Sequence, residues 1–351
     1  MRGLTPDPML RRLSIGLLAS AVAIAPLPLK AQDDRAEDLG DVMSISLKDV
    51  VKPTLGFQGA LQGAGTPNQA GIGGFLPLSV GDNSVWFLDA LVNANFSDRE
   101  GYSSIVNTDV AGATVSTSTR LGYRWLNGDR SWMYGLNAGY DSRPITSGEA
   151  DTGVSVKDKR TVLFQQIAFN AEAVHESGFG LNAYTNIPVG NTFQRLNSNY
   201  NGGALDLYGL DASYYLRPEL KIKAGYYFQD TDCYVNESSS GGQVALEYEA
   251  TDDLVFGLKA SYDEIFETRI LGSISYRLGL PAQENSSSRS IGQSKLPVIQ
   301  SLTGSIANRD IKVADGCYMQ QGMCRNLSEC GCPTFVCNAL LCVPVCDYAA
   351  C

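Results

Sequence analysis

The chain has 351 residues, enough for one large domain with appendages. Its formal net charge of −10 argues against nucleic acid and anionic lipid surfaces as partners. Only one apolar run stands out, at residues 13–25, and it is too short to cross a bilayer as a helix. A bundle of membrane helices is therefore excluded.

The N-terminal segment has the features of a secretory signal. Arg11 and Arg12 precede the apolar run, and Ala31 supplies a small residue before Gln32. This order predicts a signal peptide over residues 1–31, rather than a short membrane anchor. Residues 32–50 are polar and acidic, so we expect a periplasmic lead-in, in a bacterium with two membranes.

From residue 51 to residue 280 apolar residues alternate with polar or small ones. A period of two is typical of β-strands, because successive side chains point to opposite faces. The predicted strands cover 51–63, 72–80, 84–97, 110–126, 131–142, 160–174, 178–189, 203–216, 220–230, 242–250, 254–263 and 268–280. Most runs have about ten residues or more, which is long enough for a tilted strand to cross a bilayer.

The two faces of each run differ in chemistry, most plainly in the last runs. One face of 254–263 carries Leu254, Phe256, Leu258, Ala260 and Tyr262, and the other carries Gly257, Lys259, Ser261 and Asp263. An apolar, aromatic face opposite a polar one predicts an all-β fold, a transmembrane antiparallel barrel of about twelve strands with a polar lumen. The alternative is a soluble β-sandwich, whose core face should lack charge.

The connections between runs support the barrel. Short turns rich in Gly, Asn, Asp and Pro lie at 81–84, 127–130, 175–178, 217–219 and 251–253. Longer loops lie at 98–109, 143–159, 190–202 and 231–241. Outer-membrane barrels place short turns in the periplasm and long loops outside, so we expect both barrel ends in the periplasm.

Charged residues on the polar face should line the lumen. They are Arg120, Arg124, Asp141, Asp211, Lys221, Lys223, Glu247, Glu249, Lys259, Asp263, Arg269 and Arg277. They could grip a segment of the chain or pass ions, or they could form an internally neutralised lattice of ion pairs. Their mixed signs argue against a strongly ion-selective pore, which would carry a ring of one sign.

A polar, Ser-rich linker begins after the barrel and covers 281–316, and a cysteine-dense tail follows at 317–351. The tail holds Cys317, Cys324, Cys330, Cys332, Cys337, Cys342, Cys346 and Cys351. An even count in an exported segment too short to bury a core predicts a disulfide framework. A zinc site is the alternative, but paired Cys-x-x-Cys spacing and a nearby His are missing. Cys233, in the loop after the ninth strand, is either a free thiol or bonded to a tail cysteine.

Several segments of the barrel resemble the β-domain of inverse autotransporters, the intimin and invasin family. The resemblance rests on 121–125 (LGYRW), 134–141 (YGLNAGYD), 181–184 (LNAY) with Pro188, 209–212 (GLDA) and 246–279. It covers residues 51–280. It implies a twelve-stranded barrel whose C-terminal passenger leaves through the pore while the following linker plugs the lumen. Residues 308–311 (NRDI) resemble the post-barrel linker of that family.

The function expected from this resemblance is anchoring and surface display of the disulfide-rich tail, with a diffusion porin or structural barrel as the alternative. The sequence departs from the family, since it lacks a peptidoglycan-binding module before the barrel and immunoglobulin-like repeats after it. The expected partners are outer-membrane lipid, the barrel-assembly machinery and an extracellular ligand of the tail. We expect no enzymatic activity, because His175 is the single histidine and lies in a predicted turn, and no cofactor, because the sequence has no phosphate-binding glycine loop.

Overall fold

The computed structural model describes residues 43, 45–62, 68–96, 114–146, 160–196, 201–230, 238–251, 253–278, 296–315, 335–338 and 341–344. The predicted signal peptide, Cys233 and the side chains of the tail cysteines lie outside the described residues. No helix within the described part of the chain is long and apolar enough to span a membrane.

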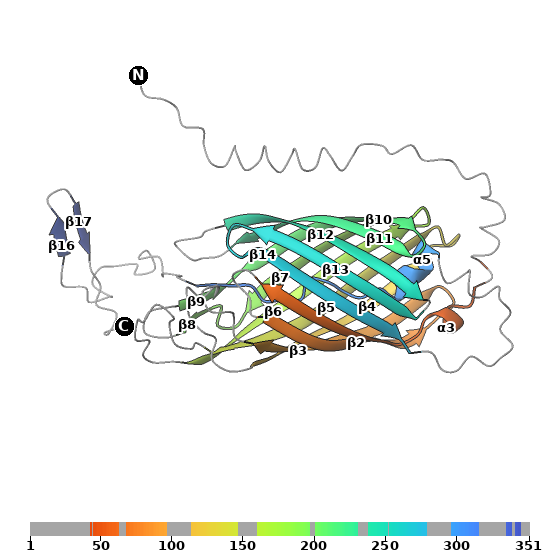
Figure 1. The fold of residues 1–351 in the computed structure, drawn as a ribbon, viewed down its shortest axis with the longest axis horizontal. Helices are drawn as coiled ribbons and strands as arrows, with labels where there is room; N and C mark the ends of the chain where they lie inside the picture. Colours follow the sequence, from red (N-terminus) through yellow and green to blue (C-terminus); the bar gives the residue numbers. More distant parts are fainter. Residues whose placement is uncertain are drawn as a thin grey trace, which may run out of the picture. The chain divides into compact units, whose positions relative to one another are not determined.

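Twelve antiparallel strands form a closed barrel, which confirms the predicted fold class. The strands are β1 (Thr54–Gln62), β2 (Asn68–Val80), β3 (Ser84–Phe96), β4 (Thr114–Leu126), β5 (Trp132–Thr146), β6 (Thr161–His175), β7 (Phe179–Val189), β10 (Asp206–Arg217), β11 (Leu220–Asp230), β12 (Ser238–Thr251), β13 (Leu254–Asp263) and β14 (Glu267–Arg277). Pairing of β1 with β14, from Thr54 opposite Arg277 to Gln62 opposite Arg269, closes the barrel (Figure 1).

The outer surface of the barrel is apolar. Leu258 is 56% exposed and Tyr262 59%, although both alternate with polar residues that face inward. At the end with the short turns, aromatic rings on β3, β4 and β5 form a continuous row from Trp86 to Trp132, with neighbouring centroids 4.8–5.9 Å apart. An apolar band edged by aromatic rings is the exterior of a membrane-spanning barrel.

Several strands extend further than the alternation predicts. β2 begins at Asn68 rather than residue 72, β5 continues to Thr146 rather than 142, and β12 begins at Ser238 rather than 242. These extensions lie at the end with the long loops, where hairpins continue to pair. Pairing there needs no apolar outer face, so the alternation that marks the membrane band does not reveal it.

Short elements lie at both ends of the barrel. α3 (Leu47–Val50), α5 (Pro297–Gln300) and the 3-10 helix η1 (Ser301–Thr303) lie at the end with the short turns (Figure 1). At the opposite end β8 (Phe193–Arg195), β9 (Asn201–Ala204) and β15 (Val313–Asp315) form a three-stranded sheet. The predicted strand 203–216 therefore begins at Asp206, because residues 201–204 pair with β8 and β15 instead. A separate pair joins β16 (Phe335–Asn338) and β17 (Leu341–Pro344).

Candidate functional site

The lumen is the candidate site, and the twelve predicted charged residues all occur at positions that alternate with the exposed outer face. Arg120, Arg124, Asp141 and Asp211 are 1% exposed and Asp263 is 2% exposed. The others are partly buried. Lys223 lines a cavity in the lumen together with Asp211 and Lys259, and the other residues form pairs within the wall or contact a segment that lies inside the lumen.

Four ion pairs join neighbouring parts of the wall. Arg120 lies 2.5 Å from Asp141, Arg124 2.7 Å from Glu172, Lys221 3.7 Å from Glu247, and Arg277 2.9 Å from Glu249. In this part of the lumen each of these charges therefore has a partner of opposite sign within the wall. Such pairs fix the side chains that narrow the lumen.

Inward-facing glycines make room for several of these cross-wall contacts. Arg124 and Glu172 lie on either side of Gly135 in the ladder, and a Cβ at residue 135 would lie 2.5 Å from the Glu172 carboxylate. In the same way Gln243 Nε2 donates to Asp211 Oδ1 across Gly225, at 2.5 Å. A glycine between two polar partners therefore lets their side chains bond over the intervening strand, a role beyond the turns and curvature that glycine usually serves in barrels.

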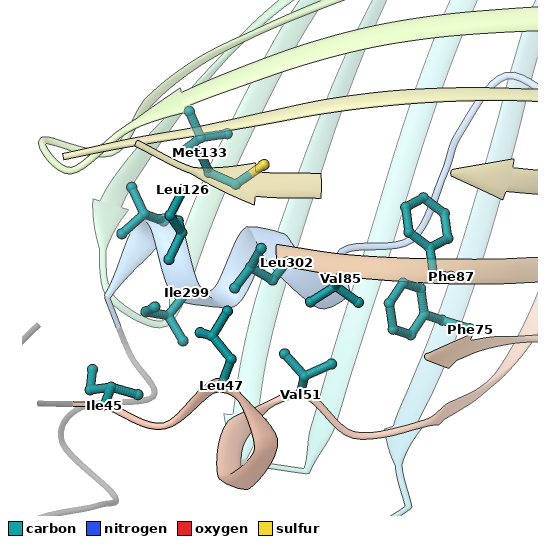
Figure 2. Packing of buried hydrophobic residues seen from close by; sticks show 12 residues of the cluster. Ile45, Leu47, Val51, Phe75, Val85, Phe87, Leu126, Met133, Ile299 and Leu302 are labelled. Carbon is teal, nitrogen blue, oxygen red and sulfur yellow. The ribbon is translucent and has the colours of Figure 1, made fainter. Parts of the chain in front are cut away.

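Residues 296–315 occupy the lumen and run from the end with the short turns to the end with the long loops. α5 and η1 lie at the first end, where Ile299 and Leu302 belong to one apolar cluster with Leu47 of α3 and Phe75 of β2 (Figure 2). Arg124 Nη1 donates to the Leu302 carbonyl oxygen at 2.9 Å. The apolar cluster and this bond hold the segment where it enters the barrel.

Gln300 adds a second attachment at the same end. Its Nε2 donates to Glu249 Oε2 and to the Pro218 carbonyl oxygen, each at 3.1 Å. The lead-in is fixed nearby, because Arg130 Nη1 donates to the Ile45 carbonyl oxygen at 2.7 Å and its Nε to Asn83 Oδ1 at 2.9 Å. Chain segments before and after the barrel thus meet at one end of it.

In the middle of the lumen the segment turns at Asn308, whose φ is +59°. Asn tolerates this left-handed conformation better than most residues. Asn186 Nδ2 donates to the Asn308 carbonyl oxygen at 2.9 Å, and Lys259 Nζ donates to its side-chain oxygen. The wall therefore binds the carbonyl oxygen and the side-chain oxygen of this residue.

The three charged residues that follow each bind a wall residue of opposite sign. Arg309 pairs with Asp89 at 2.5 Å, Asp310 pairs with Arg269, and Lys312 pairs with Asp263 at 2.9 Å. Ile311 lies between Asp310 and Lys312, and its carbonyl oxygen accepts a hydrogen bond from Arg143 Nη1 at 2.6 Å. The wall therefore contacts this segment through charges of opposite sign and through a charged donor to its backbone.

At the far end a small apolar cluster surrounds the segment as it leaves the barrel. Ile311 and Val313 pack with Ile145, Phe164 and Leu196, from the projecting parts of β5 and β6 and from the β8–β9 region. β15 then pairs with β9, with Val313 opposite Ala204. The segment is consequently held by backbone pairing where it passes the long loops.

Sequence reasoning missed several residues of this site. Asp89, Glu172, Arg143 and Asn186 bind the segment or a wall charge but were not among the predicted lumen residues. Asp89 lies between Leu88 and Ala90, on the inward side of its run, so the alternation of the sequence already predicts that its side chain faces the lumen. His175 ends β6, with its Nδ1 2.8 Å from Ser177 Oγ and its ring against Trp132, away from the lumen site.

The segment leaves part of the lumen open. A cavity of about 190 Å³ lies beside residues 305–312, bounded by Lys223, Lys259 and Asp211 and by the small residues Gly257 and Ser273. No group of three or more metal-binding side chains occurs among the residues that the structure describes. The geometry is that of a membrane barrel whose interior is occupied along its length by its own chain, with this cavity beside it.

The sequence matches no protein-family model, and no curated protein sequence is significantly similar to it. Solved outer-membrane barrels share the fold at low similarity. The translocator domain of autotransporter NalP from Neisseria meningitidis is 13% identical, with a TM-score of 0.41, over 76% of this chain and 98% of that one. An outer membrane channel from Pseudomonas putida F1 is 12% identical, with a TM-score of 0.46, over 65% and 96%. The KdgM porin is 7% identical, with a TM-score of 0.39, over 64% and 99%.

Proposed function

We propose that this barrel is an outer-membrane translocator of the inverse autotransporter type, which anchors a small disulfide-rich C-terminal segment and displays it at the cell surface. The observation that carries the proposal is the course of residues 296–315. They enter at the end with the short turns and leave at the end with the long loops, where β15 pairs with β9. Because short turns face the periplasm, the chain after residue 315 starts on the outer side.

The contacts within the lumen support anchoring rather than solute passage. A diffusion pore needs an open path, whereas the inner wall here binds a segment of its own chain at Asn308, Arg309, Asp310 and Lys312. The barrel therefore acts as a membrane anchor through which the C-terminal segment has already passed. The tail cysteines, once oxidised outside the cytoplasm, would give that segment its fold.

The test is the location of the tail on intact cells. An epitope placed after Cys351 should react with antibody on unbroken cells, as an epitope in the long loop 97–113 should. An epitope in the short turn 127–131 should react only after the outer membrane is permeabilised. A tail epitope that behaves like the one in the short turn would refute display and would favour a porin or structural barrel with a periplasmic tail.

A further inference from the structure

The charges of the segment inside the lumen follow an order that the wall repeats with opposite sign. The charged triplet of the segment consists of Arg309, Asp310 and Lys312, in the order plus, minus, plus. Its wall partners are Asp89 on β3, Arg269 on β14 and Asp263 on β13, in the order minus, plus, minus. Asp263 and Arg269 lie on the consecutive strands β13 and β14, but Asp89 lies far from both in sequence, and all three are far from the triplet, so this match is a property of the folded barrel.

We propose that the charged triplet fixes the register of the chain in the lumen, and that this charge match ends the outward movement of the C-terminal segment. The first part stands on the contacts alone, and the second part rests on the proposed function. The triplet thereby acts as a stop signal encoded by three side chains.

The order of charges rejects neighbouring registers. A shift by one residue in either direction brings Arg309 to Arg269 or Asp310 to Asp89, which are like charges. A shift by two residues brings Asp310 to Asp263 or Lys312 to Arg269, again like charges. None of these four shifts keeps any of the three attractive pairs. An extended chain advances about 3.3 Å per residue, so a shift by one residue moves every charge of the triplet along the lumen by about that distance.

Burial makes these mismatches costly. Arg309 is 8% exposed and Asp89 4% exposed, and Arg309 also bonds through its Nε to the Ile306 carbonyl oxygen at 3.0 Å. Lys312 Nζ lies 2.9 Å from Gln229 Oε1 and 4.1 Å from the centroid of the Tyr227 ring. When the segment shifts, a buried wall charge loses its partner, and little water reaches the site to take the partner's place. A shifted segment would therefore leave buried charges unpaired.

Reversing and swapping one pair in the full-length chain tests the proposal. Register is read from a disulfide between Val313→Cys and Ala204→Cys, which lie opposite each other in the β15–β9 ladder. Peptide mapping without reductant identifies this bond among the native cysteines. We expect Asp89→Arg and Arg309→Asp each to lower its yield at least about threefold, and the double swap to restore it to within about twofold.

The control is Lys221→Glu, which reverses a charge in a pair confined to the wall, and it should leave the yield unchanged. If Asp89→Arg prevents the barrel from folding, the disulfide yield of Arg309→Asp tests the proposal by itself, because this variant leaves the wall unchanged. An unchanged yield in Arg309→Asp, or a swap that is no better than the single variants, would overturn the proposal. A normal yield in a protein whose tail is absent from the cell surface would count against display and not against the register.

Discussion

Replacing Arg124 by Met should destabilise the barrel more than any other single change to the wall pairs. The Arg124 side chain has 1% exposure, lies 2.7 Å from Glu172 and donates to the Leu302 carbonyl oxygen. Its guanidinium carbon lies 4.6 Å from the centroid of the Phe87 ring. One side chain therefore joins β4, β6, the apolar cluster and the segment that fills the lumen.

The magnitude follows from what the substitution leaves behind. Removing one partner of a buried ion pair costs about 3–5 kcal/mol, because the other charge is left unpaired. The Glu172 side chain keeps 16% exposure, so water can partly solvate it, and we take about 2–4 kcal/mol for this loss. The Leu302 carbonyl loses a charged donor, which adds about 1 kcal/mol. The expected total is about 3–5 kcal/mol.

The assay is urea unfolding of the protein in lipid vesicles, followed by tryptophan fluorescence. The double variant Arg124→Met with Glu172→Gln should be more stable than Arg124→Met alone by about 1–2 kcal/mol, because it removes the unpaired carboxylate. The Glu172→Gln variant alone should lose less free energy of unfolding than Arg124→Met, since Arg124 keeps its contacts with Leu302 and Phe87. A cost below about 1 kcal/mol for Arg124→Met would refute this account of the wall.

Three further predictions concern the outer face, a glycine and the tail. Leu258→Arg should cost about 2–4 kcal/mol in the same unfolding assay if this residue lies at the membrane midplane, and a neutral effect would mean that the faces are inverted. Gly225→Val should cost about 1–3 kcal/mol, since a Cβ there would lie 1.9 Å from Asp211 Oδ1, whereas Gly272→Val, with no described atom within 4 Å of the added Cβ, should cost less. Equal losses of stability in Gly225→Val and Gly272→Val would refute the role of Gly225 in making room for the Asp211–Gln243 bond. The eight tail cysteines should resist alkylation in protein taken from cells without reductant, and eight reactive thiols would refute the disulfide framework.

The barrel could be predicted from the sequence because its periodicity is local. Lipid outside and a polar lumen inside force residues two apart to share one chemistry, as in Leu254, Phe256 and Leu258. The lengths of the turns and loops then indicate which end of the barrel faces the periplasm, without any knowledge of the fold. These signals act within about ten residues and depend little on distant contacts.

The site could be predicted only in part, because its contacts join distant residues. The inward position of Arg269 follows from its own strand, but its pairing with Asp310 depends on where the segment lies after closure of the barrel. The β15–β9 pairing joins residues more than a hundred positions apart through strands of three and four residues. Strands this short carry too few residues to show a period.

The central claim, that residues 296–315 fill the lumen, is tested most directly by conductance in planar lipid bilayers. The full-length chain should conduct poorly, and a chain that ends at Leu280 should conduct well. A shift in apparent mass on heating before electrophoresis should show that the shortened barrel is folded. Equally large conductance from both folded proteins would contradict the account, because the lumen would then be open whether or not the segment is present.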